Sequence, residues 1–145
     1  MATAAPLRSY RTIATQTAPP GQLVLMLYEG AIRFLDCALA GFQHEDPLEF
    51  NETINNNVIR AQDILNELSN SLDLQQGGAL AFTLRGLYDY MHRQLTVSNT
   101  RKSPEGIHDT IKRLSILRDA WSEMLRQQTT APAVTQHPAS FALSS

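Results

Sequence analysis

Two pairs of side chains have the spacing of metal ligands on a helix, a carboxylate followed three residues later by a histidine. They are Asp89 with His92 and Glu105 with His108. Helical bundles hold two iron or manganese ions with such pairs when both members of each pair project into the core. At roughly 100° per residue, Asp89 lies nearly opposite the apolar stripe of its own segment, and Glu105 and His108 point away from theirs. The spacing therefore predicts no metal centre and disfavours a metal-dependent oxidoreductase.

Other arrangements that could carry out catalysis are also missing from the pattern. His44 and His137 fall in a predicted loop and in the C-terminal segment, where neither is placed to orient a nucleophile. Gly77-Gly78 lacks the preceding strand and the lysine of a phosphate cradle. Cys37 is the sole cysteine, and its apolar neighbours predict a small buried side chain rather than a nucleophile. We therefore expect a protein that is not an enzyme and holds no cofactor.

Composition and charge favour a folded domain without a surface for nucleic acid. Hydrophobic residues make up 43% of the 145 residues and charged residues 18%, with a net charge of −2. The charged share lies below the roughly 25% of typical domains, which indicates a neutral surface. The basic residues are scattered, so nucleic acid is not an expected partner. The chain has neither an apolar run of the roughly 20 residues needed for membrane insertion nor a secretory signal, and we expect a cytoplasmic protein.

Prolines, glycines and capping residues divide the chain into four expected helices. Pro19-Pro20 precede the first, and Asp46-Pro47 with Glu49 form an N-cap, a proline at the first helical position and a capping box for the second. Gly77-Gly78 separates the second helix from the third. The expected helices cover residues 20–42, 47–72, 79–99 and 104–127. They predict an N-terminal arm at 1–18, a helical domain at 19–127 and a flexible tail at 128–145.

Apolar residues recur every three or four positions in the last three of these helices, which is typical of one buried face on each. The predicted core stripes are Ile54, Val58, Ala61, Leu65, Leu68 and Leu72; Leu80, Leu84, Leu87, Met91 and Leu95; and Ile107, Ile111, Leu114, Trp121 and Leu125. Helices of this length with short connections pack most simply as an antiparallel bundle. The predicted fold class is therefore all-α, an antiparallel four-helix bundle.

Some helices carry more apolar surface than such a bundle needs. The first is hydrophobic around most of its circumference, with polar residues confined to a narrow arc. Phe82, Tyr90 and Val97 project away from the core stripe of the third helix, and Ile116 projects away from that of the fourth. Scattered exposed apolar residues are common in monomeric proteins. The same pattern fits a groove that receives an amphipathic segment, and periodicity alone leaves both interpretations open.

Five stretches of the chain, in order and with similar spacing, resemble the flagellar secretion chaperones of the FliS family. They are Tyr10 followed by Pro20-Gly21-Gln22-Leu23-Val24-Leu25-Met26-Leu27-Tyr28-Glu29-Gly30-Ala31-Ile32; Ala61-Gln62-Asp63-Ile64-Leu65-Asn66-Glu67-Leu68; Ser71-Leu72-Asp73; Gly77-Gly78 with Leu87-Tyr88-Asp89-Tyr90-Met91; and Leu117-Arg118-Asp119-Ala120-Trp121. The chain departs from the family at Pro19, where Ser or Thr is usual, and at Ala79, where Glu is frequent.

This resemblance implies an export chaperone. Members of the family bind the disordered C-terminal segment of flagellin in the cytoplasm, prevent premature polymerisation and help deliver it to the flagellar export gate. The resemblance also implies that Tyr10 lies in an arm whose placement affects client binding. The candidate partner-binding residues are Tyr10, Ile13, Ile64, Phe82, Tyr90, Val97 and Ile116. The alternative is a homo-oligomeric structural or regulatory bundle; a chaperone is expected to be a monomer or a weak dimer when free.

Overall fold

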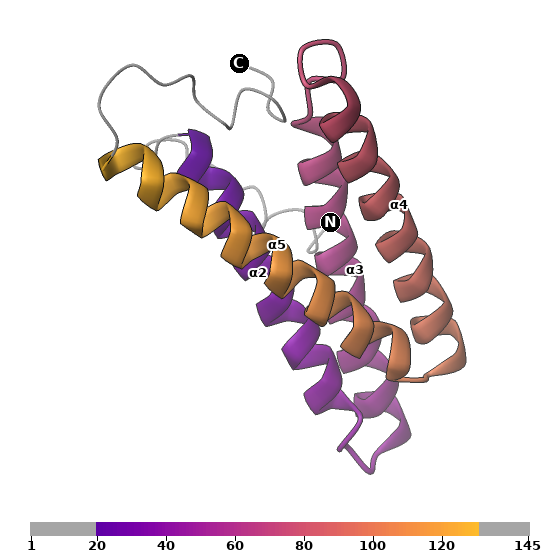
Figure 1. Ribbon diagram of the computed structural model, residues 1–145. Helices are drawn as coiled ribbons and strands as arrows, with labels where there is room; N and C mark the ends of the chain where they lie inside the picture. The colour runs from indigo at the N-terminus through magenta and orange to yellow at the C-terminus, as the bar shows by residue number, and fades with distance from the viewer. Residues whose placement is uncertain (1–19, 131–145) are drawn as a thin grey trace.

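A computed structural model describes residues 20–130 of the chain, and its regular structure consists of long helices (Figure 1). In chain order these are α2 (Pro20–Gly41), α3 (Pro47–Asn70), α4 (Gly78–Arg101) and α5 (Glu105–Thr130). The all-α class predicted from the sequence is confirmed. The starts of α2 and α3 are as predicted, and the other ends differ from the predicted ones by one to three residues, the largest difference being the extension of α5 to Thr130.

The helices form an antiparallel bundle in which each packs against the next one in the chain and α5 returns to pack against α2. The axes are not parallel throughout. Figure 1 shows α4 and α5 close together at the short turn that joins them and diverging from there, as α5 crosses toward the start of α2. One edge of the bundle, between α4 and α5, is therefore closed near that turn and opens away from it.

Capping groups set where α3 begins and where α4 ends. The Asp46 carboxylate accepts a hydrogen bond of 3.0 Å from the backbone N–H of Glu49, with Pro47 at the first helical position, as the sequence predicts. At the end of α4, Lys102 has a φ of 51° in the left-handed region, and its backbone N–H donates to the last turn of the helix. A left-handed residue is a common helix terminator and turns the chain sharply into α5.

The core confirms most of the predicted stripes but corrects one position. Every predicted core residue of α3, including Ile54 and Leu65, is buried. In α4, however, Leu80 is 48% exposed, and Ala81 takes the core position in its place. The buried stripe of α4 runs through Ala81, Leu84 and Tyr88 to the end of the helix. In this rotation of the helix about its axis, the Tyr88 ring faces the core. The prediction for Leu80 was wrong because two adjacent stripes on α4 are both apolar.

Cys37 is a second correction, since its side chain is exposed rather than buried in the core. The residues on either side of it in the helix, Leu35 and Ala38, are completely buried. Cys37 instead shares the solvent-facing arc of α2 with Arg33 and Asp36, which are also exposed. The polar arc of α2 is therefore wide enough to include the cysteine.

Two buried hydrogen bonds join helices that are distant in the sequence. The hydroxyl oxygens of Tyr28 and Tyr88 lie 2.5 Å apart between α2 and α4, and both tyrosines are buried in the core. Burial raises the pKa of Tyr28 to about 12, although the hydrogen bond to Tyr88 acts in the opposite direction. The indole N–H of Trp121 donates to the backbone carbonyl of Gly21 at 2.8 Å and ties α5 to the first turn of α2.

Candidate partner-binding surface

The outer face of α4 presents a row of large apolar side chains to solvent. Phe82, Tyr90 and Val97 are all exposed, Phe82 most of all at 62%. At roughly 100° per residue, the three side chains fall within an arc of about 80° and so share the outer side of the helix. Gly86 lies between the first two, and no atom comes within 4 Å of where its Cβ would be. The result is a strip of exposed apolar side chains along α4 that no other described helix covers, with the exposed charged residues Asp89 and Arg93 on the same face.

Helix α5 carries a fourth exposed apolar side chain and packs against α4 near the turn that joins them. Ile116 on α5 is 61% exposed. Near the α4–α5 turn the two helices are in tight contact, since a Cβ at Gly106 would overlap the Ser98 hydroxyl and lie 3.0 Å from the Gln94 carbonyl oxygen. Ile116 lies ten residues further along α5 than Gly106. Figure 1 shows α5 diverging from α4 beyond the turn.

Tyr90 is held in place by polar neighbours from both helices. The side-chain amide of Gln94 donates to the Tyr90 hydroxyl at 2.9 Å. The Arg113 guanidinium lies 5.0 Å from the centre of the Tyr90 ring, within the range of a cation–π contact. Asp109 in turn accepts a hydrogen bond of 2.8 Å from Arg113 and, as the main cause, raises the pKa of that guanidinium. The ring is thus positioned before any partner arrives.

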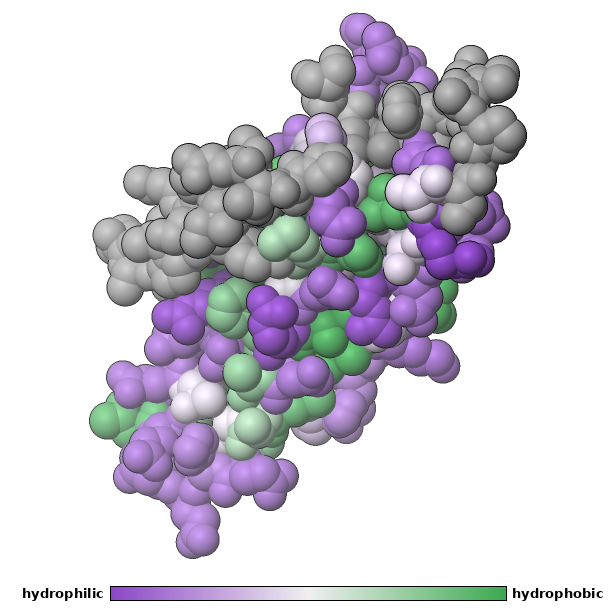
Figure 2. All heavy atoms as spheres, turned by 90° about the vertical axis from the view of Figure 1, so that its left-hand side faces the viewer, coloured by the Kyte–Doolittle hydropathy of each residue, from purple (hydrophilic) through white to green (hydrophobic). Residues whose placement is uncertain are grey.

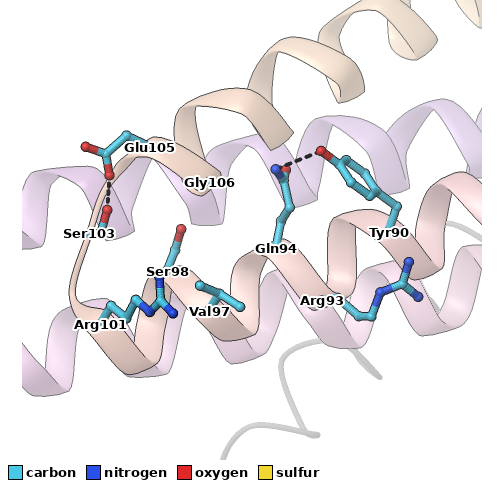
Figure 3. A pocket seen from close by; sticks show the side chains of 9 residues that line it. All are labelled: Tyr90, Arg93, Gln94, Val97, Ser98, Arg101, Ser103, Glu105 and Gly106. Carbon is cyan, nitrogen blue, oxygen red and sulfur yellow. Dashed lines mark hydrogen bonds between the residues drawn. The ribbon is translucent and has the colours of Figure 1, made fainter.

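A pocket of about 460 Å³ lies on this face beside the α4–α5 turn. Figure 3 shows Val97 between the Arg101 side chain and the Gln94–Tyr90 pair, with Ser103 and Glu105 at the turn. The lining residues are Tyr90, Arg93, Gln94, Val97, Ser98, Arg101, Ser103, Glu105 and Gly106. Two of the four exposed candidate residues therefore contribute to one concave surface.

The opposite side of the molecule, where α2 and α5 lie, has a different character. Figure 2 shows apolar residues gathered in the middle of this face, with polar residues around them. Several hydrophobic side chains of these two helices are only partly buried against the core, among them Leu23 and Leu25 on α2 and Leu117 and Met124 on α5. The wide apolar arc expected for the first helix is therefore divided between buried and partly buried side chains.

The sequence matches the family model described as flagellar protein FliS over residues 3–128, which is most of the chain. The protein belongs to the FliS family. A flagellar secretion chaperone FliS of Bacillus subtilis is 30% identical over 128 residues, or 88% of this chain and 92% of the relative. That of Campylobacter jejuni is 34% identical over 112 residues, covering 77% and 84%, and that of Salmonella typhimurium 32% over 129 residues, covering 86% and 93%.

Membership of the FliS family places this chain among the flagellar secretion chaperones rather than the enzymes. Within residues 20–130, no three His, Cys, Asp or Glu side chains come together as metal ligands would. In the same part of the chain, none of the helices has the length and hydrophobicity needed to cross a membrane.

The candidate binding residues of this FliS-family chain fall into three groups. Phe82, Tyr90 and Val97 are exposed on α4, and Ile116 is exposed on α5. Ile64 is only 1% exposed and belongs to the core, where α3 packs against both α2 and α4. Its inclusion in the candidate set is corrected on that ground. Tyr10 and Ile13 lie outside the described residues.

Sequence reasoning also missed surface features. Arg93, Gln94 and Arg101 line the pocket, but they were passed over because polar residues on a helix usually face solvent without a role. Their spacing on one side of α4 could have drawn attention to them. Leu48, which is 63% exposed in the first turn of α3, was not singled out either. No periodic signal marks it, because it precedes the apolar stripe of that helix.

Proposed function

We propose that this FliS-family chaperone binds the C-terminal segment of flagellin in the cytoplasm and prevents its premature polymerisation. The bound subunit is then delivered to a protein of the flagellar export gate. The observation that carries the proposal is the apolar strip on α4, formed by Phe82, Tyr90 and Val97 with Ile116 beside it, which none of the described helices covers. The relatives are named as flagellar secretion chaperones, which agrees with a client that is exported.

The geometry of the strip suits a client that folds as it binds. At a rise of roughly 1.5 Å per residue, the side chains of Phe82 and Tyr90 are about 12 Å apart along α4, and those of Tyr90 and Val97 about 10 Å. An amphipathic helix lying along α4 offers apolar side chains at a similar interval. A disordered segment loses chain entropy on binding and recovers free energy by burying apolar surface.

The proposal is tested with full-length flagellin of the same bacterium and the complete chaperone chain. We expect one stoichiometric complex in size-exclusion chromatography and a longer lag in seeded filament growth. If flagellin neither co-elutes with the chaperone nor changes its rate of assembly, the proposed function is wrong.

A matched pair of variants locates the binding surface. Phe82→Asp places a charge in the strip, whereas Leu48→Asp places one on an equally exposed leucine in α3, 63% against 62%. We expect Phe82→Asp to weaken flagellin binding at least tenfold and Leu48→Asp to leave it unchanged, with the helicity of both retained. Equal binding by the two variants would remove the strip from the interface.

The alternative function, a bundle that pairs with itself, is favoured by the same exposed side chains, since Phe82 and Ile116 could also bury each other across a dimer. Light scattering on the free protein separates the two functions. A stable dimer that Phe82→Asp dissociates, together with no flagellin binding, would support self-association.

A further inference from the structure

The pocket beside the α4–α5 turn combines apolar and cationic groups. The Tyr90 ring and Val97 supply apolar surface, while Arg93 and Arg101 contribute guanidinium groups from the same helix. Glu105 is the one carboxylate among the lining residues, so the pocket carries a formal charge of +1 from two arginines and one glutamate. The chain as a whole has a net charge of −2. The pocket is thus a local positive region on an acidic protein.

The two pocket arginines differ from three arginines of α5. Arg113, Arg118 and Arg126 each form an ion pair, with Asp109, Asp119 and Glu123 respectively. Within residues 20–130, Arg93 and Arg101 have no ion pair or hydrogen bond through their side chains. The carboxylate of Glu105 instead accepts a hydrogen bond from the Ser103 hydroxyl at the turn. Both arginines are therefore available to a carboxylate from outside.

The Gln94 side chain, which lines the pocket, has one polar atom without a hydrogen-bond partner. Its amide nitrogen donates to the Tyr90 hydroxyl, and its carbonyl oxygen is buried without a partner. Turning the amide by 180° would let the oxygen accept from Tyr90 and would leave the nitrogen unpartnered instead. In either orientation one polar atom lacks a hydrogen bond. A peptide group, which is both a donor and an acceptor, could complete either arrangement after a small rotation of the side chain.

We propose that this pocket binds an acidic residue of the client segment, with its carboxylate at Arg93 or Arg101 and a neighbouring apolar residue against Tyr90 and Val97. The inference rests on the proposed function and adds a chemical requirement to it. The apolar strip accepts many amphipathic helices, whereas the pocket selects one with an Asp or Glu about one helical turn from an apolar side chain. It thereby sets the register of the client along α4.

The test compares variants that remove the same charge at different places. The double variant Arg93→Gln with Arg101→Gln removes both positively charged side chains from the lining of the pocket. Arg33→Gln with Arg85→Gln removes two exposed arginines that do not line it, one on α2 and one on α4. Affinity for full-length flagellin is measured by calorimetry at low and high salt, with circular dichroism as a check on folding. We expect roughly tenfold weaker binding and a smaller salt dependence for the pocket variant alone.

Three outcomes separate this inference from the proposed function. Unchanged affinity of the pocket variant, with wild-type binding intact, overturns the acidic anchor and leaves flagellin binding standing. Absence of binding by the wild-type chain overturns both. Arg93→Lys with Arg101→Lys keeps the positive charge, so it should retain most of the affinity. If it loses as much as the glutamine variant, charge is not the cause of the loss and the anchor is again overturned.

Discussion

The buried pair of hydroxyl groups between α2 and α4 offers a quantitative test of how the bundle is held together. Tyr88→Phe removes one hydroxyl and leaves that of Tyr28 buried without its partner at 2.5 Å. Tyr28→Phe does the reverse, and the double variant removes both polar groups while keeping both rings. The rings are tilted with centroids 6.5 Å apart, so the phenyl groups can pack where the phenols did.

The expected free energies follow from burial. Both tyrosines are at most 2% exposed, so an orphaned hydroxyl there cannot be hydrated from bulk water. Leaving a buried polar group unsatisfied costs about 1–3 kcal/mol, whereas removing both partners is nearly neutral. We therefore expect each single variant to lose about 2 kcal/mol of stability and the double variant about 1 kcal/mol or less. The pair then shows a coupling free energy of about 3 kcal/mol in the double-mutant cycle.

Urea unfolding, followed by circular dichroism at neutral pH, measures all four proteins on one scale. The denaturant slope should stay constant, because the surface exposed on unfolding hardly changes. If the losses of the two single variants simply add in the double variant, the hydroxyl groups are not coupled. That result would refute the reasoning, since each ring would then be stabilised independently of the other hydroxyl.

Three further predictions concern stability. The folded-state pKa of Tyr28, about 12 against 10.0, means that the unfolded chain loses this proton first. The contribution of Tyr28 to stability should be complete below pH 10 and fall by about 3 kcal/mol between pH 10 and 12, and Tyr88, whose pKa is also raised by burial, should add to the loss in this range. Alkaline urea titration measures the total loss, and Tyr28→Phe should lose less stability than the wild-type chain over that range. Gly106→Ala forces a methyl group against α4 and should lower the stability of the protein by about 1–3 kcal/mol. Gly86→Ala adds a methyl group that meets open space and improves helix propensity, so it should raise the stability by about 0.5–1 kcal/mol. Equal melting temperatures for these two variants would contradict the close approach of α4 and α5. Trp121→Phe removes the hydrogen bond to the Gly21 carbonyl and should cost about 1 kcal/mol in the same assay; no change would show that this bond contributes nothing net.

Local signals in the sequence were sufficient for the elements of the fold. Asp46-Pro47 determines the start of α3 through a side-chain cap and a ring that needs no N–H donor, and the structure contains both. The apolar period of three and four residues identified nearly all of the core in α3, α4 and α5. These signals act within a few residues of one another, so they can be evaluated without knowing what lies across the bundle.

The rotation of each helix about its axis was harder to predict. In α4 the stripes through Leu80 and through Ala81 are both apolar, and only packing against the neighbouring helices turned the second one inward. In α3, Ile64 is outside the predicted core stripe and is among the candidate partner-binding residues. It is buried because α3 contacts two helices at once. A helical wheel gives angles between residues of one helix but not the direction of its neighbours.

The sequence by itself determined the four helices, their caps, most of the core and the resemblance to FliS chaperones, including which side chains on α4 project away from the core. Only the tertiary structure decided that Tyr90 and Val97 share a pocket with Arg93 and Arg101. That pocket depends on the left-handed turn at Lys102 and on the approach of Gly106 to α4, which set α5 beside the strip. The physical reason is the distance along the chain over which each feature is determined. Helix caps and apolar periodicity involve residues a few positions apart, whereas a concave surface depends on how two helices pack against each other.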